Sequence, residues 1–481
     1  MAFIGNRIKE FARLKPDATA LVCGRTSLTW RELADQTQKV ENYLINTVAD
    51  DARVALILNN PVSLLVCFFA CARSGRVAML MSPDWPAAQT SAVLGATRPE
   101  HQIEDTLFEA LLAGSDPAAA ELQPLGPPPG EDTLFYAGFT SGSTGLPKGY
   151  VRSHGSWLES FLISDKEVDP ELIDRIVLPG KLSHSLHLYA AVHGLDRGIE
   201  VVVAPRFDPR TILDELAAAK YGSALYATPT HLKLIAEAAQ SRDAISIVRL
   251  VFSSGAKWQE ADHKALHNVF PNAQLIEFYG ASETSFISWS RQDNTVPCGS
   301  VGRPADGVQV VIGDPDRPEP TGSSGLIWVK SPLLFSGYIC GETPDTEWRN
   351  GWLAFGDYGY LDKNGFLFLI GRETRMIVTS GLNVFPEEVE RALMQHPSVR
   401  CAVAFGRSDP LRGERLEAVV QLTASLANAE RALQQHCTTL LGKPKSPRKL
   451  HVRDEIPLTP GGKPDIQRVL AELSASNQET L

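Results

Sequence analysis

Residues 139–149 offer the clearest chemistry in this 481-residue chain. They read FTSGSTGLPKG, a run of glycine and hydroxyl residues that ends near a lysine. Glycine lets the backbone approach an anion closely, while Ser, Thr and exposed backbone N–H groups donate to phosphate oxygens. Lys148 adds a point charge. The stretch is therefore a candidate phosphate-binding loop between a strand-like lead-in and a helix-like segment.

Better-known nucleotide and nucleophile motifs are absent. No Gly-Lys pair precedes Ser or Thr, which excludes a Walker A loop. No two glycines have the G-x-G spacing, which excludes a dinucleotide fingerprint. No G-x-S-x-G string exists, which argues against an α/β-hydrolase. Composition alone would fit a solvated turn better than a binding loop, so the interpretation depends on other motifs.

Four further strings combine glycine with charged or hydroxyl side chains. They are Tyr279–Glu283 (YGASE), Gly356-Asp357, Gly371-Arg372 and Pro457–Lys463 (PLTPGGK). Taken singly, each has an ordinary explanation: a surface acid, an Asp in a β-turn, or an exposed lysine in a tail. Only the combination of the strings and their order along the chain can distinguish a functional site from these ordinary explanations.

In order and spacing, the five strings resemble the signatures of the adenylate-forming (AMP-binding) superfamily. That superfamily includes acyl-CoA synthetases, luciferases and peptide-synthetase adenylation domains, and the resemblance covers residues 134–465. It implies that a carboxylate attacks the α-phosphorus of ATP and releases pyrophosphate. Lys463 would contact both anions, offset their repulsion and orient the attack.

The resemblance also implies a set of site residues. Lys463, Glu283 and His184 are the expected catalytic residues, and Glu283 and Thr144 the expected Mg²⁺ ligands. Tyr279 would form a wall for the adenine, and Asp357 would accept hydrogen bonds from the ribose hydroxyls. The full set expected to bind the nucleotide is Thr140, Ser141, Gly142, Ser143, Thr144, Lys148, Ser254, Gly255, Tyr279, Gly280, Ala281, Ser282, Asp357 and Arg372.

Three positions depart from the superfamily pattern. Ser282 and Phe355 each stand where threonine is usual, and only the serine keeps the hydroxyl. Thr374 stands at the usual hinge position, commonly Asp or Lys. A hinge only has to absorb a backbone change, so its function can survive the replacement.

The acceptor of the acyl group is read from the string SGLNVFPEEVE (380–390). It is similar to CoA ligases rather than amino-acid-adenylating domains, and it implies that Ser380 and Gly381 line a tunnel for CoA. A ligase that loads a separate carrier protein stays open, with the basic run 443–449 as a possible docking patch. A non-catalytic homologue is disfavoured because Lys463, Glu283 and Asp357 are all present.

Residues 178–194 should form the acyl pocket, with His184 beside the carboxylate. Amino-acid activators usually place an aspartate here to bind the substrate ammonium, but this segment has no acidic residue before Asp196. A free α-amino acid is therefore disfavoured, and an aliphatic or aromatic carboxylic acid is preferred, as in fatty or aryl acid–CoA ligases.

The secondary-structure elements that must position these residues can be predicted from the pattern of apolar residues along the chain. From residue 26 to 285, strand-like runs alternate with helical segments, which favours an α/β fold with parallel sheets and a site at the strand carboxyl ends. Residues 296–370 have short strands and turn glycines, typical of an antiparallel β subdomain. We expect an N-terminal AMP-binding domain over 1–372 and a small, mobile α+β lid domain over 373–481.

Bulk properties limit the partners. The net charge of −10 gives no electrostatic reason to bind nucleic acid. Seven scattered cysteines suggest no disulfide framework or zinc site and fit a reducing cytoplasm. The N-terminus lacks an apolar signal segment, and the most apolar run, 64–72, is too short to span a bilayer.

Overall fold

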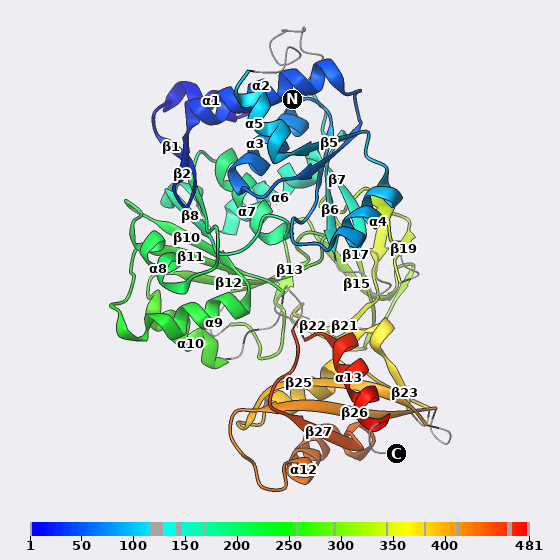
Figure 1. Cartoon of the computed structure of the whole chain (residues 1–481). Helices are drawn as coiled ribbons and strands as arrows, with labels where there is room; N and C mark the ends of the chain where they lie inside the picture. Colours follow the sequence, from blue (N-terminus) through cyan, green and yellow to red (C-terminus); the bar gives the residue numbers. More distant parts are fainter. Residues whose placement is uncertain are drawn as a thin grey trace.

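The computed structural model describes most of the chain. The described residues are 2–114, 128–140, 147–167, 169–255, 258, 260–291, 295–342, 345–379, 381–409, 413–458 and 464–478. Figure 1 shows two α/β sheets in the N-terminal part, an antiparallel sheet beside them, and a separate sheet with helices at the C-terminal end.

In the part of the chain that the structure describes, nine strands form the largest sheet, ordered β14-β13-β12-β11-β10-β8-β9-β1-β2. Its centre, from β12 to β1, is parallel, and antiparallel strands close both edges. The strands are β1 (Thr19–Cys23), β2 (Thr26–Thr29), β8 (Arg175–Leu178), β9 (Glu200–Val203), β10 (Ser223–Ala227), β11 (Val248–Ser253), β12 (Gln274–Tyr279), β13 (Ser288–Arg291) and β14 (Arg303–Pro304).

The second sheet has six strands over the described ranges, ordered β18-β7-β6-β4-β3-β5. Strands β3 to β6 are parallel, whereas β7 and β18 add antiparallel pairs. The strands are β3 (Arg53–Ile57), β4 (Val77–Leu80), β5 (His101–Glu104), β6 (Leu134–Thr140), β7 (Lys148–Ser153) and β18 (Gly337–Cys340).

Helices cover both faces of these sheets. Helices α3, α6 and α7 share one buried core with both sheets, α8 to α10 cover the other face of the nine-stranded sheet, and α4 packs on the outer face of the second. The helices are α1 (Ile8–Leu14), α2 (Trp30–Thr47), α3 (Pro61–Arg73), α4 (Ala87–Thr97), α5 (Asp105–Leu112), α6 (His154–Glu167), α7 (Ser185–Asp196), α8 (Pro209–Ala217), α9 (Pro229–Ala238) and α10 (Glu260–Val269).

Residues 309–372 form the antiparallel sheet, as the turn-rich sequence predicts. Two strands of the predicted β subdomain pair elsewhere, because β14 extends the nine-stranded sheet and β18 pairs with β7. The strands that stay together are β15 (Gln309–Asp314), β16 (Arg317–Pro318), β17 (Gly325–Lys330), β19 (Glu347–Arg349), β20 (Trp352–Ala354), β21 (Asp357–Leu361) and β22 (Leu367–Arg372).

The C-terminal sheet follows a short 3₁₀ turn, η4 (Glu373–Arg375). Helices α11 and α12 pack on one face in a small core of their own, and α13 packs on the other. The elements are β23 (Ile377–Thr379), β24 (Leu382–Val384), α11 (Pro386–Met394), β25 (Val399–Asp409), β26 (Gly413–Leu422), α12 (Ala429–Leu441), β27 (Lys449–Arg453) and α13 (Ile466–Gln478).

The predicted α/β class is confirmed. Helix α2 begins with a reciprocal capping box: the Thr29 hydroxyl accepts from the Glu32 backbone N–H, and the Glu32 carboxylate accepts from the Thr29 N–H. Helix α3 is apolar on all sides, and both its cysteines are buried and free. No described helix is long and apolar enough to cross a membrane.

Candidate active site

The predicted nucleotide residues gather at one edge of the nine-stranded sheet. Strands β12, β11 and β8 are parallel, and their carboxyl ends lead into residues 279–283, 254–255 and 180–184. Carboxyl ends of parallel strands share an edge, where loops commonly bind ligands. The sheet order therefore brings three predicted segments to the same side of the molecule, with β11 directly beside β12.

At the end of β12, Tyr279 lies beside two other residues predicted to bind the nucleotide, Asp357 and Arg372. Its hydroxyl donates to Asp357 Oδ2 at 2.6 Å, and Arg372 Nε donates to Asp357 Oδ1 at 2.7 Å. Strand register explains the second contact, because Asp357 of β21 pairs directly with Arg372 of β22. The Asp357 carboxylate is 7% exposed. Since each carboxylate oxygen can accept more than one hydrogen bond, Asp357 keeps capacity for a ribose hydroxyl.

This cluster shifts the pKa of both donors. Burial, and then the Asp357 charge, raise the pKa of Tyr279 well above its usual value, so the phenol stays protonated as a donor. The Asp357 charge raises the pKa of Arg372 despite opposing burial. The result is a fixed array of one carboxylate and two donors.

A tight turn follows β12 and fixes the next predicted residues. The Ala281 N–H donates to Thr284 Oγ1 at 2.9 Å, and the Thr284 N–H returns a bond to the Ala281 carbonyl. A Cβ on Gly280 would lie 1.8 Å from the carbonyl oxygen of Ser285, so only glycine fits there. The turn presents Ser282 and Glu283 immediately beyond the strand.

Glu283 is held from a different sheet. The Tyr338 hydroxyl, on β18, donates to Glu283 Oε1 at 2.7 Å, and the Phe335 N–H donates to the Glu283 carbonyl at 2.8 Å. The Glu283 residue is 8% exposed. Burial raises the pKa of Tyr338, with the Glu283 charge as the second cause, so this phenol also stays a donor.

Arg152, on β7, is a site residue that the sequence analysis missed. Its guanidinium donates to the Ser282 carbonyl at 3.0 Å, the Ser285 hydroxyl at 2.8 Å and the Leu333 carbonyl at 2.6 Å. It is 2% exposed, and burial lowers its pKa to about 10, still charged at neutral pH. Its only sequence signal is a basic residue in a strand-like run, so its role emerges only from the fold.

The phosphate-loop prediction is only partly visible. Thr140 ends β6 and Lys148 begins β7, and the two residues pair across the base of the hairpin. Lys148 Nζ lies 3.6 Å from an Asp345 carboxylate oxygen. The predicted phosphate ligands Ser141, Gly142, Ser143 and Thr144 lie outside the described residues.

The loop after β11 approaches the same edge. Ser254 and Gly255 follow the strand, and Gly255 has a φ of +108°, where a Cβ would meet no atom within 4 Å. Further along, the Trp258 N–H donates to Glu277 Oε1 on β12 at 2.9 Å. This bond ties the Ser254-Gly255 segment to the strand that ends at Tyr279.

His184 lies at the N-cap of α7 and makes no side-chain capping bond. His184 is exposed to solvent, although protein surrounds its ring on several sides. The partial desolvation lowers the pKa of His184, and the positive charge of Lys181 lowers it further. Behind it, the His187 ring packs against Gly180, where a Cβ would lie 2.1 Å away. Neither ring nitrogen of His187 has a hydrogen-bond partner of ordinary geometry among the described residues.

The predicted C-terminal residues are less completely described. Lys463 and Ser380 lie outside the described residues. The base of the Lys463 loop is closed, since Leu458 bridges Pro464 and the Asp465 N–H donates to the Pro457 carbonyl at 2.8 Å. Gly381 lies at the turn between β23 and β24, with a φ of +79°.

The hinge position lies between two sets of ion pairs. Thr374 is the middle residue of η4. On one side, Arg372 pairs with Asp357 of β21; on the other, Arg375 donates to Glu387 at 2.9 Å and to Glu390 at 2.6 Å, both on α11. Residue 374 therefore joins two charged anchors, one on the antiparallel sheet and one on the C-terminal unit.

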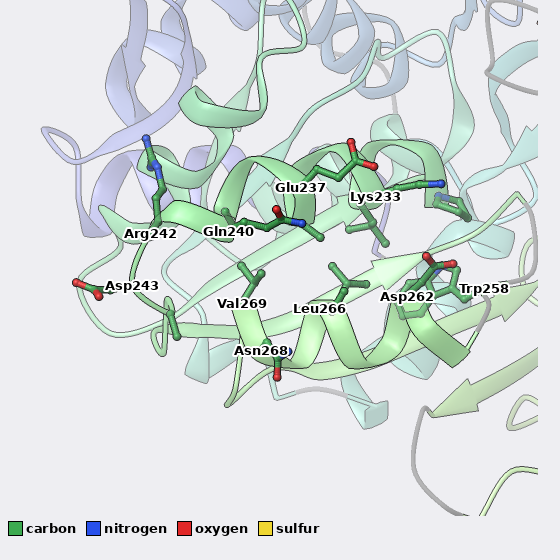
Figure 2. Close-up of a pocket in the computed structure, with 16 residues that line it drawn as sticks. Lys233, Glu237, Gln240, Arg242, Asp243, Trp258, Asp262, Leu266, Asn268 and Val269 are labelled. Carbon is green, nitrogen blue, oxygen red and sulfur yellow. The ribbon is translucent and has the colours of Figure 1, made fainter. Parts of the chain in front are cut away.

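A pocket of about 480 Å³ lies away from these residues, between α9 and α10 (Figure 2). Leu232, Leu266 and Trp258 line it, with Lys233 and Asp262 near the Trp258 end and Arg242 at the other. None of the predicted site residues contributes to it. No described group of three His, Cys, Asp or Glu residues could hold a metal ion by itself.

Known families and proteins match this chain over most of its length. Residues 8–339 match the family "AMP-binding enzyme", and residues 388–463 match "AMP-binding enzyme C-terminal domain". An uncharacterized acyl–CoA ligase, YhfT of Bacillus subtilis, is 34% identical over 97% of this chain and 98% of its own length.

Two further proteins extend the likeness. VraA of Staphylococcus aureus, described as a putative long chain fatty acid-CoA ligase, is 30% identical over 84% of this chain and 85% of its own. ATP-bound MatB of Rhodopseudomonas palustris superposes with a TM-score of 0.82 at 25% identity, over 97% of this chain and 98% of that one. With most of its length matched, this chain belongs to the AMP-binding enzyme family, among the AMP-forming enzymes of its acyl-CoA ligase group.

Proposed function

We propose that this protein activates a carboxylic acid with ATP and Mg²⁺ to an acyl-adenylate, releases pyrophosphate, and transfers the acyl group to CoA. The observation that carries the proposal is the cluster of Tyr279, Asp357 and Arg372 beside the Glu283 turn. The proposal is supported by the closeness of Asp357, proposed to bind the ribose, to Glu283, proposed to bind the metal, in a chain of this family.

In the proposed adenylation step, different residues of the chain bind the ribose, the adenine, the phosphates and the acid. Asp357 and Arg372 hold the ribose, while Tyr279 backs the adenine. The Ser282 hydroxyl and the loop between Thr140 and Lys148 hold the phosphates, and Lys463 bridges the α-phosphate and the attacking carboxylate. His184, at the start of α7, lies beside the carboxylate. Arg152 positions the turn by donating to the Ser282 carbonyl and the Ser285 hydroxyl.

Glu283 fits a magnesium ligand. Its carboxylate and the nearby hydroxyls of Ser and Thr are hard oxygen donors, and a site with one carboxylate plus nucleotide phosphates is usual for Mg²⁺. Thr144 is proposed as the second protein ligand. When bound, Mg²⁺ neutralises phosphate charge as it builds in the transition state. The Tyr338 hydrogen bond orients the Glu283 carboxylate for this role.

CoA is the proposed acceptor, with Ser380 and Gly381 in its tunnel, and the acid is aliphatic or aromatic. The feature in favour of a carrier protein is the basic run 443–449. One of its lysines already has a partner within the chain, because Lys445 pairs with Glu388 at 2.7 Å. We propose domain boundaries of 1–372 and 373–481, with the second domain mobile about Thr374. All seven cysteines are free, which fits the cytoplasm.

The test is acid-dependent pyrophosphate–ATP exchange, followed by thioester formation with and without CoA, in the wild type and in Lys463→Ala. We expect exchange with one acid class, thioester only with CoA, and a loss of exchange by about a hundredfold or more in the variant. Lys443→Ala, an exposed lysine of the same region, is the matched control.

Each alternative gives a different result. Exchange without a CoA thioester would transfer the proposal to a carrier-protein acceptor. The absence of exchange with every acid would overturn the enzymatic proposal, and equal activity of Lys463→Ala would overturn the role of that lysine.

A further inference from the structure

Six aromatic side chains fill the space between the nine-stranded sheet and α7, directly behind residues 279–283. We call this group the aromatic block. Ring centroids in it lie 4.5 to 5.3 Å apart at the closest contacts. Its members are Tyr189, Tyr226, Phe252, Phe278, Phe286 and Trp289.

The aromatic block borders both predicted sides of the acid site. Phe278 immediately precedes Tyr279 on β12, and Phe286 follows the Glu283 turn by three residues. Tyr189 lies just over one helical turn beyond His184, and its ring meets Phe286 edge-on at 5.3 Å. The block therefore joins the wall that carries the turn to the helix that carries His184.

The chemistry of adenylation directs the acid toward this block. The carboxylate must reach the α-phosphate at Ser282, while the ribose occupies the Asp357 and Arg372 side. The remainder of the acid must point away from the nucleotide, into the space between the turn and α7. Phe278 is only partly buried, unlike the rest of the block, which makes it the member that an acid could contact.

Hydrogen bonds and close packing hold the aromatic block in place. The Tyr189 hydroxyl donates to the Ser160 carbonyl at 3.0 Å and lies 2.6 Å from the Ser164 hydroxyl, both on α6. Phe252 and Phe286 are each 2% exposed. Inserting extra methylene groups into such a core forces side chains off their rotamers and shifts the backbone. A long acyl chain would have to displace several rings at once.

We infer that the aromatic block closes the acyl site and that the enzyme activates compact acids, short aliphatic or single-ring, in preference to long-chain fatty acids. The inference rests on the proposed function and names the substrate class of that same site. It separates this chain from the long-chain substrate in the description of the relative VraA.

The experiment measures kcat/KM for pyrophosphate release with acetate, butyrate, hexanoate, benzoate, octanoate, dodecanoate and palmitate. Wild type is compared with Phe278→Ala and the milder Phe278→Leu. Phe270→Ala is the matched control, because it empties an equally large buried ring position on the opposite face of the sheet, in the core formed with α8 to α10. Thermal melting of each variant reports folding.

The wild type should use the compact acids and discriminate against octanoate and longer chains by at least about tenfold, since each methylene group can change kcat/KM by that factor. Phe278→Ala should raise the octanoate-to-butyrate ratio at least about tenfold, with Phe278→Leu intermediate and Phe270→Ala unchanged. Wild-type turnover of palmitate equal to that of butyrate would overturn the inference and leave the proposed function intact. Inactivity with every acid would instead overturn the proposed function.

Discussion

Asp357 lies at the centre of the proposed nucleotide site, because donors from two different sheets converge on its carboxylate. In Asp357→Asn, a neutral amide replaces the carboxylate and can accept through only one oxygen. Hydrogen bonds to charged groups contribute about 1.5–3 kcal/mol, so we expect kcat/KM for ATP to fall about tenfold to a hundredfold.

The matched control is Asp362→Asn on the same β21–β22 hairpin, where the carboxylate accepts from the backbone N–H groups of Asn364 and Phe366. It should leave kcat/KM for ATP within about threefold of wild type, the effect of less than 1 kcal/mol. A similar loss in both variants would trace the effect to hairpin stability rather than to ribose binding.

Two buried histidines make stability depend on pH. Burial lowers the pKa of both His154 and His187 from 6.5 to about 3. His154 Nδ1 also accepts from the Ile4 N–H at 3.0 Å, which only the neutral ring can do. Between pH 6.5 and 3 the unfolded chain binds protons that the native chain does not. The contribution of each neutral histidine to stability is therefore fully present above pH 6.5. It is lost progressively as the pH falls from 6.5 toward 3.

At pH 5 each histidine should lower the free energy of unfolding by about 2 kcal/mol relative to pH 7. Urea unfolding at the two pH values measures the difference. His187→Gln should reduce the pH dependence, whereas His267→Gln, an exposed surface site, should not. Identical pH dependence in wild type and His187→Gln would show that the His187 ring is protonated in the native state.

At the scale of elements, the proposed movement of the C-terminal domain would pass through η4. Arg372 and Arg375 hold its two ends to different parts of the chain, so the proposed rotation would take place at the residues between them. Proline at position 374 would fix one backbone dihedral there. We expect Thr374→Pro to keep pyrophosphate–ATP exchange and to slow thioester formation by about tenfold, an added barrier of ~1.4 kcal/mol.

Single-turnover assays that separate the two half-reactions provide the measurement. Thr374→Ala, which leaves the dihedral free, is the control and should resemble wild type in both steps. Equal slowing of both half-reactions in Thr374→Pro would mean that the turn is needed for the adenylation geometry itself.

At the scale of the whole molecule, local signals predicted most elements. The α2 start was predictable because a capping box is contained within four residues, and the strands from β8 to β12 because apolar runs alternate with helical periodicity. The places of β14 and β18 were not predictable. Each is short, and its partner strand belongs to another sheet, so pairing is decided by tertiary contacts.

The site divides in the same way. Motif residues such as Tyr279 and Asp357 could be named from the sequence because their strings are specific. Arg152 and Tyr338 could not, since they reach the Glu283 turn from 130 and 55 residues away and carry no local signature. The sequence thus identifies groups suited to contact the nucleotide, while the fold reveals the groups that orient them.

Helix α3 has a consequence for how the protein is made. Every residue from Val62 to Ala72 is buried, and Phe68 packs against Phe135 and Trp157. Both partners are synthesised well after the helix. Until the ribosome has reached Trp157, the nascent chain therefore carries this apolar segment without its partners. Exposed apolar surface of this kind is where chaperones bind and where aggregation starts.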